Sequence, residues 1–215
     1  MYISKITICF AFQSELIMND NLDDLKHIRS IMERSTKFLS LSGISGVSAG
    51  VFALLGSLVA YLDINGVVAF TDSIVIDFII IASCVFILAC TSAFYFSLRK
   101  ARKNNSKFWM PATRQVLKDF AVPLVSGGLF CLLLIYHEVG ELIGSATLIF
   151  YGLALISAGA RTYRDIKILG ACQIILGVLA GCFIGYGLYF WAFGFGILHI
   201  VYGIVMYFKY DRDRN

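Results

Sequence analysis

Apolar residues recur along the chain in six long runs that short polar segments separate. The runs cover residues 38–62, 74–98, 119–136, 142–160, 168–190 and 193–209. A helix needs about 20 consecutive apolar residues to cross the roughly 30 Å hydrocarbon core of a bilayer. The pattern therefore predicts an all-α membrane protein, in which six transmembrane helices form a bundle over residues 38–210.

The segment before the first run has a different pattern. Four apolar residues recur at helical spacing within residues 21–37, opposite a basic side: Leu22, Leu25, Ile28 and Met32. Asn21 suits the position before such a helix, because its side chain can accept a hydrogen bond from a free backbone amide. An amphipathic helix of this kind lies at a membrane surface or docks a partner. We expect residues 1–20 to be a poorly ordered extension and residues 211–215 to be a short cytoplasmic tail.

Lysine and arginine alternate with the apolar runs. They lie before the first run, between the second and third, between the fourth and fifth, and after the sixth. The other connections, such as residues 63–73 and 137–141, carry neither. Short loops that are translocated across a membrane avoid these residues. We therefore expect a multi-pass protein of the cell membrane with both termini in the cytoplasm.

The composition excludes a soluble domain. The chain has 215 residues, of which 59% are hydrophobic and 15% charged, whereas soluble domains are about 45–50% apolar and about 25% charged. The net charge of +4 follows from the topology signals, so we expect no nucleic-acid partner. Six cysteines form no CxxC pair, and we expect neither a metal site nor a cofactor.

Small residues recur at intervals of four in two of the runs. They are Ser42, Gly46 and Gly50 in the first run, and Gly177, Gly181 and Gly185 in the fifth. Such rows let membrane helices approach closely, so we expect these residues to be helix-packing faces. In addition, LIFYGLALISA around Tyr151 resembles HIVYGIVMYF around Tyr202, which fits repeated helical hairpins in parallel orientation.

Three polar residues fall inside the apolar runs, namely Asp77, Gln173 and His199. Polar groups within a membrane are costly, so each is a candidate for a polar transport pathway. The alternative for Asp77 is a structural position at a helix start. For Gln173 and His199 it is a buried hydrogen bond between helices.

The connections without basic residues carry acidic ones. We expect Asp63, Asp72, His137, Glu138 and Glu141 to form an acidic outer face. Such a face could concentrate cations, or it could simply be what remains where basic residues are excluded. The segment HEVGE resembles the zinc-protease motif HExxH, but Glu141 replaces the second histidine, so we do not expect an enzyme.

The segment RSIMERSTKFLSLSGISGVSAG, residues 29–50, resembles the N-terminal signature of an uncharacterised family of small bacterial polytopic membrane proteins. In that signature a basic helix with an arginine–serine pair leads into a serine- and glycine-rich first span. The resemblance implies a bacterial cytoplasmic membrane. It implies no activity and no catalytic residue.

Two functions fit these observations. The first is a small permease or channel-like protein for a cation or small solute. The second is a membrane sensor or assembly scaffold in which residues 21–37 and 99–118 dock a cytoplasmic partner. The glycine faces would then set the packing of a homo-oligomer or partner within the lipid bilayer.

Overall fold

Each apolar run folds into a helix in the computed structural model, which describes residues 41–103 and 108–211. The first four helices are α2 (Gly43–Ile64), α3 (Ile74–Lys103), α4 (Pro111–Tyr136) and α5 (Ile143–Ala158), which follows the 3₁₀ turn η1 (Gly140–Leu142). Helix α6 (Arg164–Cys182) precedes the last span, which comprises α7 (Gly187–Trp191), the π-helix η2 (Ala192–Leu198), α8 (His199–Met206) and the π-helix η3 (Tyr207–Asp211).

The described residues contain six helices that are long and apolar enough to cross a membrane, and no strand. The prediction of an all-α, six-span protein is therefore confirmed, and the helices fit a multi-pass integral membrane protein. The expected extension 1–20 and amphipathic helix 21–37 lie outside the described residues.

The turn between the fifth and sixth predicted runs lies earlier in the chain than those runs place it. Helix α6 ends at Cys182 instead of continuing to residue 190, and the last span already begins at Gly187. Gly185, which we expected in a helix-packing row, lies in the turn between them with φ +91° and no atom near its missing side chain. Glycine adopts this left-handed conformation without steric cost. Apolarity alone could not separate this turn from the helices on either side.

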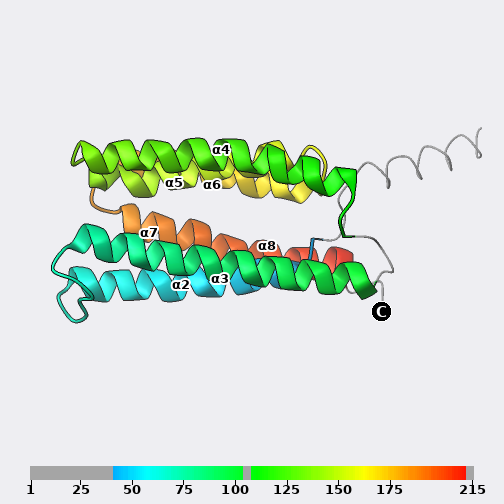
Figure 1. The fold of residues 1–215 in the computed structure, drawn as a ribbon, viewed down its shortest axis with the longest axis horizontal. Coiled ribbons are helices and arrows are strands. Elements are labelled where there is room, and N and C mark those ends of the chain that lie inside the picture. Colours follow the sequence, from blue (N-terminus) through cyan, green and yellow to red (C-terminus); the bar gives the residue numbers. More distant parts are fainter. Residues whose placement is uncertain (1–40, 104–107, 212–215) are drawn as a thin grey trace, which may run out of the picture. The chain divides into compact units, whose positions relative to one another are not determined.

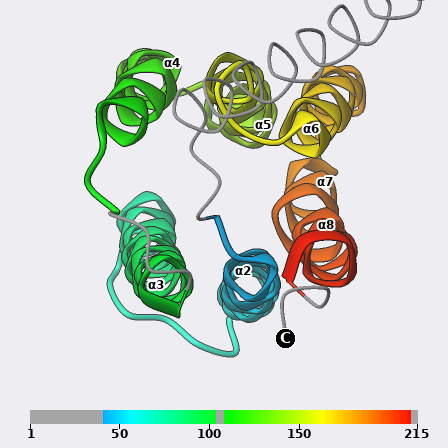
Figure 2. The ribbon, with the colours of Figure 1, turned by 90° about the vertical axis from the view of Figure 1, so that its right-hand side faces the viewer.

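The six helices lie in two layers (Figures 1 and 2). Helices α4, α5 and α6 form the first layer. The second layer consists of α3, α2 and the last span, with α7 leading from one layer to the other. Neighbouring helices within a layer pack closely, whereas the backbones of the two layers approach each other mainly around α7.

A glycine seam joins α5 to α6 in the first layer. A methyl group added at Gly152 would lie 2.6 Å from the Gly170 carbonyl oxygen and 2.7 Å from Cγ1 of Ile174. On the opposite helix, a methyl group at Gly177 would lie 2.6 Å from Cγ1 of Ile149. Only glycine permits this approach, which brings backbone hydrogens against carbonyl oxygens of the neighbouring helix.

A second glycine seam joins α2 to the last span. A methyl group at Gly50 would lie 2.6 Å from the Gly196 carbonyl oxygen and 2.7 Å from Cγ1 of Ile200. Gly203 approaches Gly43 in the same way, because its methyl group would lie 2.6 Å from the Gly43 carbonyl oxygen. The serine- and glycine-rich segment at the start of α2 is thus a packing face.

The two seams are built from corresponding residues. In each, a Tyr-Gly pair of one helix faces a glycine and, four residues later, a β-branched residue of the other helix. The corresponding pairs are Tyr151 with Tyr202, Gly152 with Gly203, Ile149 with Ile200, Gly170 with Gly43, Ile174 with Val47, and Gly177 with Gly50. The similarity between the two Tyr-Gly segments in the sequence therefore reflects equivalent packing in the structure.

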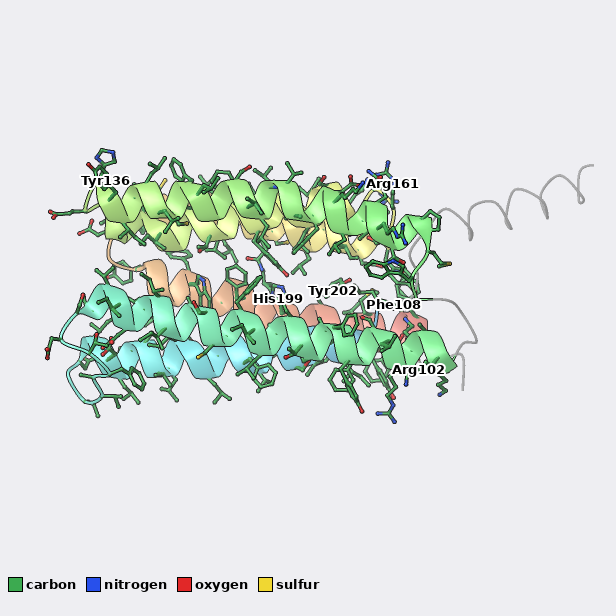
Figure 3. The ribbon with its side chains drawn as sticks, viewed as in Figure 1. Arg102, Phe108, Tyr136, Arg161, His199 and Tyr202 are labelled. Atoms are coloured by element: carbon green, nitrogen blue, oxygen red, sulfur yellow. The ribbon has the colours of Figure 1, made fainter. Side chains whose placement is uncertain are left out.

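Charged residues connect the helices within each layer at one end of the bundle, which we call the basic end. In the second layer, Asp211 accepts a hydrogen bond from the Gly43 amide at the start of α2 (2.9 Å) and pairs with Lys100 of α3 (2.6 Å). In the first layer, Arg161 pairs with Asp119 of α4. Figure 3 shows Arg102 and Arg161 at this end and Tyr136 at the other, the acidic end.

Candidate functional site

Gln173 and His199 meet at half the depth of the bundle. Gln173 is the middle residue of the span Arg164–Cys182, and His199 is the middle residue of Gly187–Asp211. Their side chains approach to 3.4 Å between Nε2 of Gln173 and Nδ1 of His199. The two residues belong to different layers, so this contact crosses between the layers.

The carbonyl oxygen of Gly194 holds both side chains. It accepts a hydrogen bond from Nε2 of Gln173 at 2.7 Å and lies 3.0 Å from Nδ1 of His199. A carbonyl can only accept, so the hydrogen-bond pattern assigns the imidazole hydrogen to Nδ1. His199 is buried, and burying a charged imidazole without a counter-charge is costly, so we assign a neutral ring whose Nε2 accepts.

Tyr151 of α5 supplies the donor for that nitrogen. Its hydroxyl lies 2.8 Å from Nε2 of His199. Tyr151, Gln173, Gly194 and His199 together form a hydrogen-bonded group that we call the polar cluster. It joins α5 and α6 of the first layer to the last span of the second.

Glycine at 194 makes room for this arrangement. A methyl group there would lie 2.6 Å from Oε1 of Gln173 and 2.6 Å from Cδ2 of Leu148. Gly194 also lies in the π-helix η2. A π-helical turn departs from the regular α-helical hydrogen bonds, and such turns are frequent at functional sites in proteins.

Aromatic rings surround the polar cluster. Phe195 stacks on the imidazole of His199 at 5.8 Å between centroids, and Tyr151 lies 4.8 Å from Phe195. Phe120 of α4 packs edge-on against Tyr151 at 5.9 Å. The hydrogen bonds of the polar cluster are therefore made in apolar surroundings, where they are stronger than in water.

One polar atom of the cluster lacks a partner. Gln173 is completely buried, and its Oε1 has no hydrogen bond to any described residue. An unsatisfied buried acceptor costs about 1–3 kcal/mol. The cluster thus carries one buried acceptor that no described residue satisfies.

Asp77 lies far from this cluster. It is 1% exposed at the start of α3, at the acidic end. Its carboxylate accepts hydrogen bonds from the Thr71 hydroxyl (2.7 Å) and the Phe70 amide (3.1 Å), which holds the connection between α2 and α3. The structure thus brings together Gln173 and His199 from the predicted pathway and leaves Asp77 outside it.

The five residues of the expected acidic face lie at the acidic end. Asp72, His137, Glu138 and Glu141 are exposed there, whereas Asp63 is 8% exposed at the end of α2. They flank the helix ends and make no contact with the polar cluster among the described contacts.

The remaining residues of the predicted packing rows lie at helix contacts. Gly46 faces Gly203, because its missing methyl group would lie 3.0 Å from that Cα atom. A methyl group at Gly181 would lie 3.0 Å from Oγ of Ser145, on α5. Ser42 precedes α2 and donates from its hydroxyl to Asp211 at 3.4 Å.

Sequence reasoning missed Tyr151 and Gly194 as partners of His199. Tyrosines and glycines are common in membrane helices, so neither residue stood out alone. The similar segments around Tyr151 and Tyr202 were the available signal. By the correspondence between the seams, His199 of the last span occupies the position that Leu148 has in α5. Gln173 of α6 occupies the position that Gly46 has in α2, so the cluster lies where the two seams differ.

The described residues contain no group of three His, Cys, Asp or Glu side chains that could hold a metal ion. The polar cluster offers hydrogen bonds from uncharged groups instead. In comparisons with known proteins, no family model, curated protein or solved structure matches this chain.

Proposed function

We propose that this protein is a small permease that carries a small polar solute across a membrane without a chemical reaction. The observation that carries the proposal is the polar cluster itself, which bridges two helix layers at half depth. In many transporters the substrate site lies near the bilayer midplane, between two structural units that rock against each other.

The packing of the layers supports such a motion. The glycine seams and the ion pairs Arg161–Asp119 and Lys100–Asp211 hold each layer together internally. Between the layers, the backbones approach mainly around α7, and the contacts elsewhere are made by side chains. Each layer is therefore suited to move as a body, with the polar cluster at the contact that changes.

The chemistry of the cluster favours an uncharged or weakly charged solute. Its side chains are a tyrosine, a glutamine and a neutral histidine, and Gln173 offers an unused acceptor. A solute with N–H or O–H groups can replace the cross-layer hydrogen bonds while the layers move apart. By the distribution of Lys and Arg, the basic end would face the cytoplasm.

The test is an osmotic swelling assay on proteoliposomes, with urea, glycerol and ammonium chloride as probes. Light scattering should show faster swelling than in protein-free vesicles for at least one probe. Gln173→Leu and His199→Leu should each reduce that excess rate about tenfold. Thr91→Val is the matched control, because Thr91 is an exposed residue of α3 that bonds only its own helix.

Equal swelling of wild-type and protein-free vesicles for all three probes, with no proton flux in a pH-dye assay, would contradict the proposal. The scaffold alternative then becomes the stronger one. It depends on residues 21–37, which lie outside the described residues.

A further inference from the structure

A hydrogen-bonded ion pair at the basic end crosses between the layers. Nζ of Lys209 donates hydrogen bonds to both carboxylate oxygens of Asp165, on α6, at 3.0 Å each. The Tyr210 hydroxyl donates to the same carboxylate at 2.8 Å. Lys209 and Tyr210 both belong to η3, in the other layer. The ion pair Arg161–Asp119, in contrast, joins residues of a single layer.

Tyr202 lies between this contact and the polar cluster. It follows His199 by about one helical turn towards η3, as Figure 3 shows. Its hydroxyl is buried and has no hydrogen-bond partner among the described residues. It packs against the same buried core as Tyr151 of the cluster and Tyr210 of the charged contact.

We propose that the route from the basic end to the polar cluster passes Tyr202 and is closed by the contact of Asp165 with Lys209 and Tyr210. We call this contact the basic gate. The inference rests on the proposed permease function and adds the regulation of its site.

The solvent exposure of Lys209 and Asp165 fits a contact that opens and closes. The Lys209 side chain is 52% exposed and that of Asp165 is 18% exposed. Ion pairs with this much solvent contact are weak, so thermal motion can break them. A gate has to open at physiological temperature, and a fully buried ion pair would be too costly to separate.

Apolar side chains close the same route beneath the gate. Met206 of α8 is fully buried and lies in one core with Leu155, Ile166 and Leu169 of the first layer. The side chains of these four residues carry no hydrogen-bonding group of the kind that Tyr202 has, so they separate without breaking hydrogen bonds of their own. Once the gate opens, the Tyr202 hydroxyl is the next group that can exchange a hydrogen bond with a passing solute.

The gate is tested by thiol labelling in lipid nanodiscs. The experiment uses the full chain, in which alanine replaces the six native cysteines. A cysteine at position 202 (Tyr202→Cys) reports access through its reaction rate with a charged methanethiosulfonate reagent. Asp165→Asn and Lys209→Gln should each raise the rate about fivefold, which corresponds to about 1 kcal/mol. The exchange of charges, Asp165→Lys with Lys209→Asp, should return the rate to within about twofold of the starting value.

Asp119→Asn is the matched control, since it removes an ion pair at the same end within one layer. An unchanged rate in Asp165→Asn and Lys209→Gln would overturn the gate. An equal rise in Asp119→Asn would overturn it too, because that result means general loosening of the helix ends.

Tyr202→Phe separates a role in the route from a structural role. The variant keeps the ring and removes a hydroxyl that stabilises nothing in the described structure, so thermal stability should not fall. Flux of the transported probe should fall at least about threefold, and unchanged flux would contradict the assignment of Tyr202. Labelling requires no solute, so failure of the gate is distinguishable from failure of the permease proposal in the swelling assay.

Discussion

A single missing methyl group at Gly194 determines whether the polar cluster can form. Gln173 fits beside the π-helix only because no Cβ atom occupies the space next to its Oε1. In return, the Gly194 carbonyl binds the two side chains that the sequence had marked as polar candidates. The role of His199 thus depends on a residue without a side chain.

Gly194→Ala should lower the free energy of unfolding by about 1–3 kcal/mol, because the added methyl group overlaps both Gln173 and Leu148. The free energy is measured by SDS titration in mixed micelles. Gly128→Ala is the matched control, since a methyl group there meets no atom within 4 Å. Equal losses in the two variants would show that a general helix effect, and not the cluster, is responsible.

Asp77→Ala should also lower stability, by about 0.5–1.5 kcal/mol, because the Phe70 amide loses its acceptor and the Thr71 hydroxyl keeps only the Ser73 carbonyl. In the same titration, Asp72→Ala should change stability by less than about 0.5 kcal/mol, as expected for an exposed residue. A loss in Asp77→Ala no larger than in Asp72→Ala would remove the structural role of Asp77.

At the scale of elements, the glycine seams decide which helices are neighbours. The sequence predicted close packing from the spacing of small residues in α2 and α6. It did not identify their partners, because α5 and the last span carry Tyr-Gly pairs instead of regular glycine rows. Partner choice depends on matching a glycine with a β-branched residue of another helix, and the spacing within one helix does not encode that match.

Gly50→Ala and Gly152→Ala should destabilise the protein by similar amounts, about 1–3 kcal/mol each, because each methyl group meets a glycine carbonyl oxygen and an isoleucine Cγ1 atom at the same distances. The comparison uses SDS titration of the two single variants and the double variant. Since the seams lie in different layers, the two losses should add within about 0.5 kcal/mol. A strong departure from additivity would mean that the layers are not independent bodies.

At the scale of the whole molecule, alternating charge predicted the topology, and hydrophobic runs predicted the number of spans. The division into two layers could not be predicted, because it depends on which side chains pair across a gap. The role of Asp77 could not be predicted from the sequence either. Its polarity suggested a place in a pathway, but its position at a helix end gave it local hydrogen-bond partners.

The topology itself is tested by labelling intact cells with a membrane-impermeant thiol reagent, in a background without native cysteines. A cysteine in place of Asp72 should react, and one in place of Arg164 should react only after the membrane is permeabilised. Both residues are exposed in the structure, at opposite ends of the bundle. Reaction of the Arg164→Cys variant in intact cells would reverse the expected orientation.

The contact of Asp211 with the start of α2 has a consequence for biosynthesis. Of the six spans in the described part of the chain, α2 leaves the ribosome first and the last span leaves it last, yet the two share a glycine seam and a carboxylate that holds the start of α2. The first layer, in contrast, consists of three consecutive helices and can assemble while translation continues. Helix α2 must therefore wait in the membrane until synthesis is almost finished, and a prematurely terminated chain would leave its glycine face uncovered.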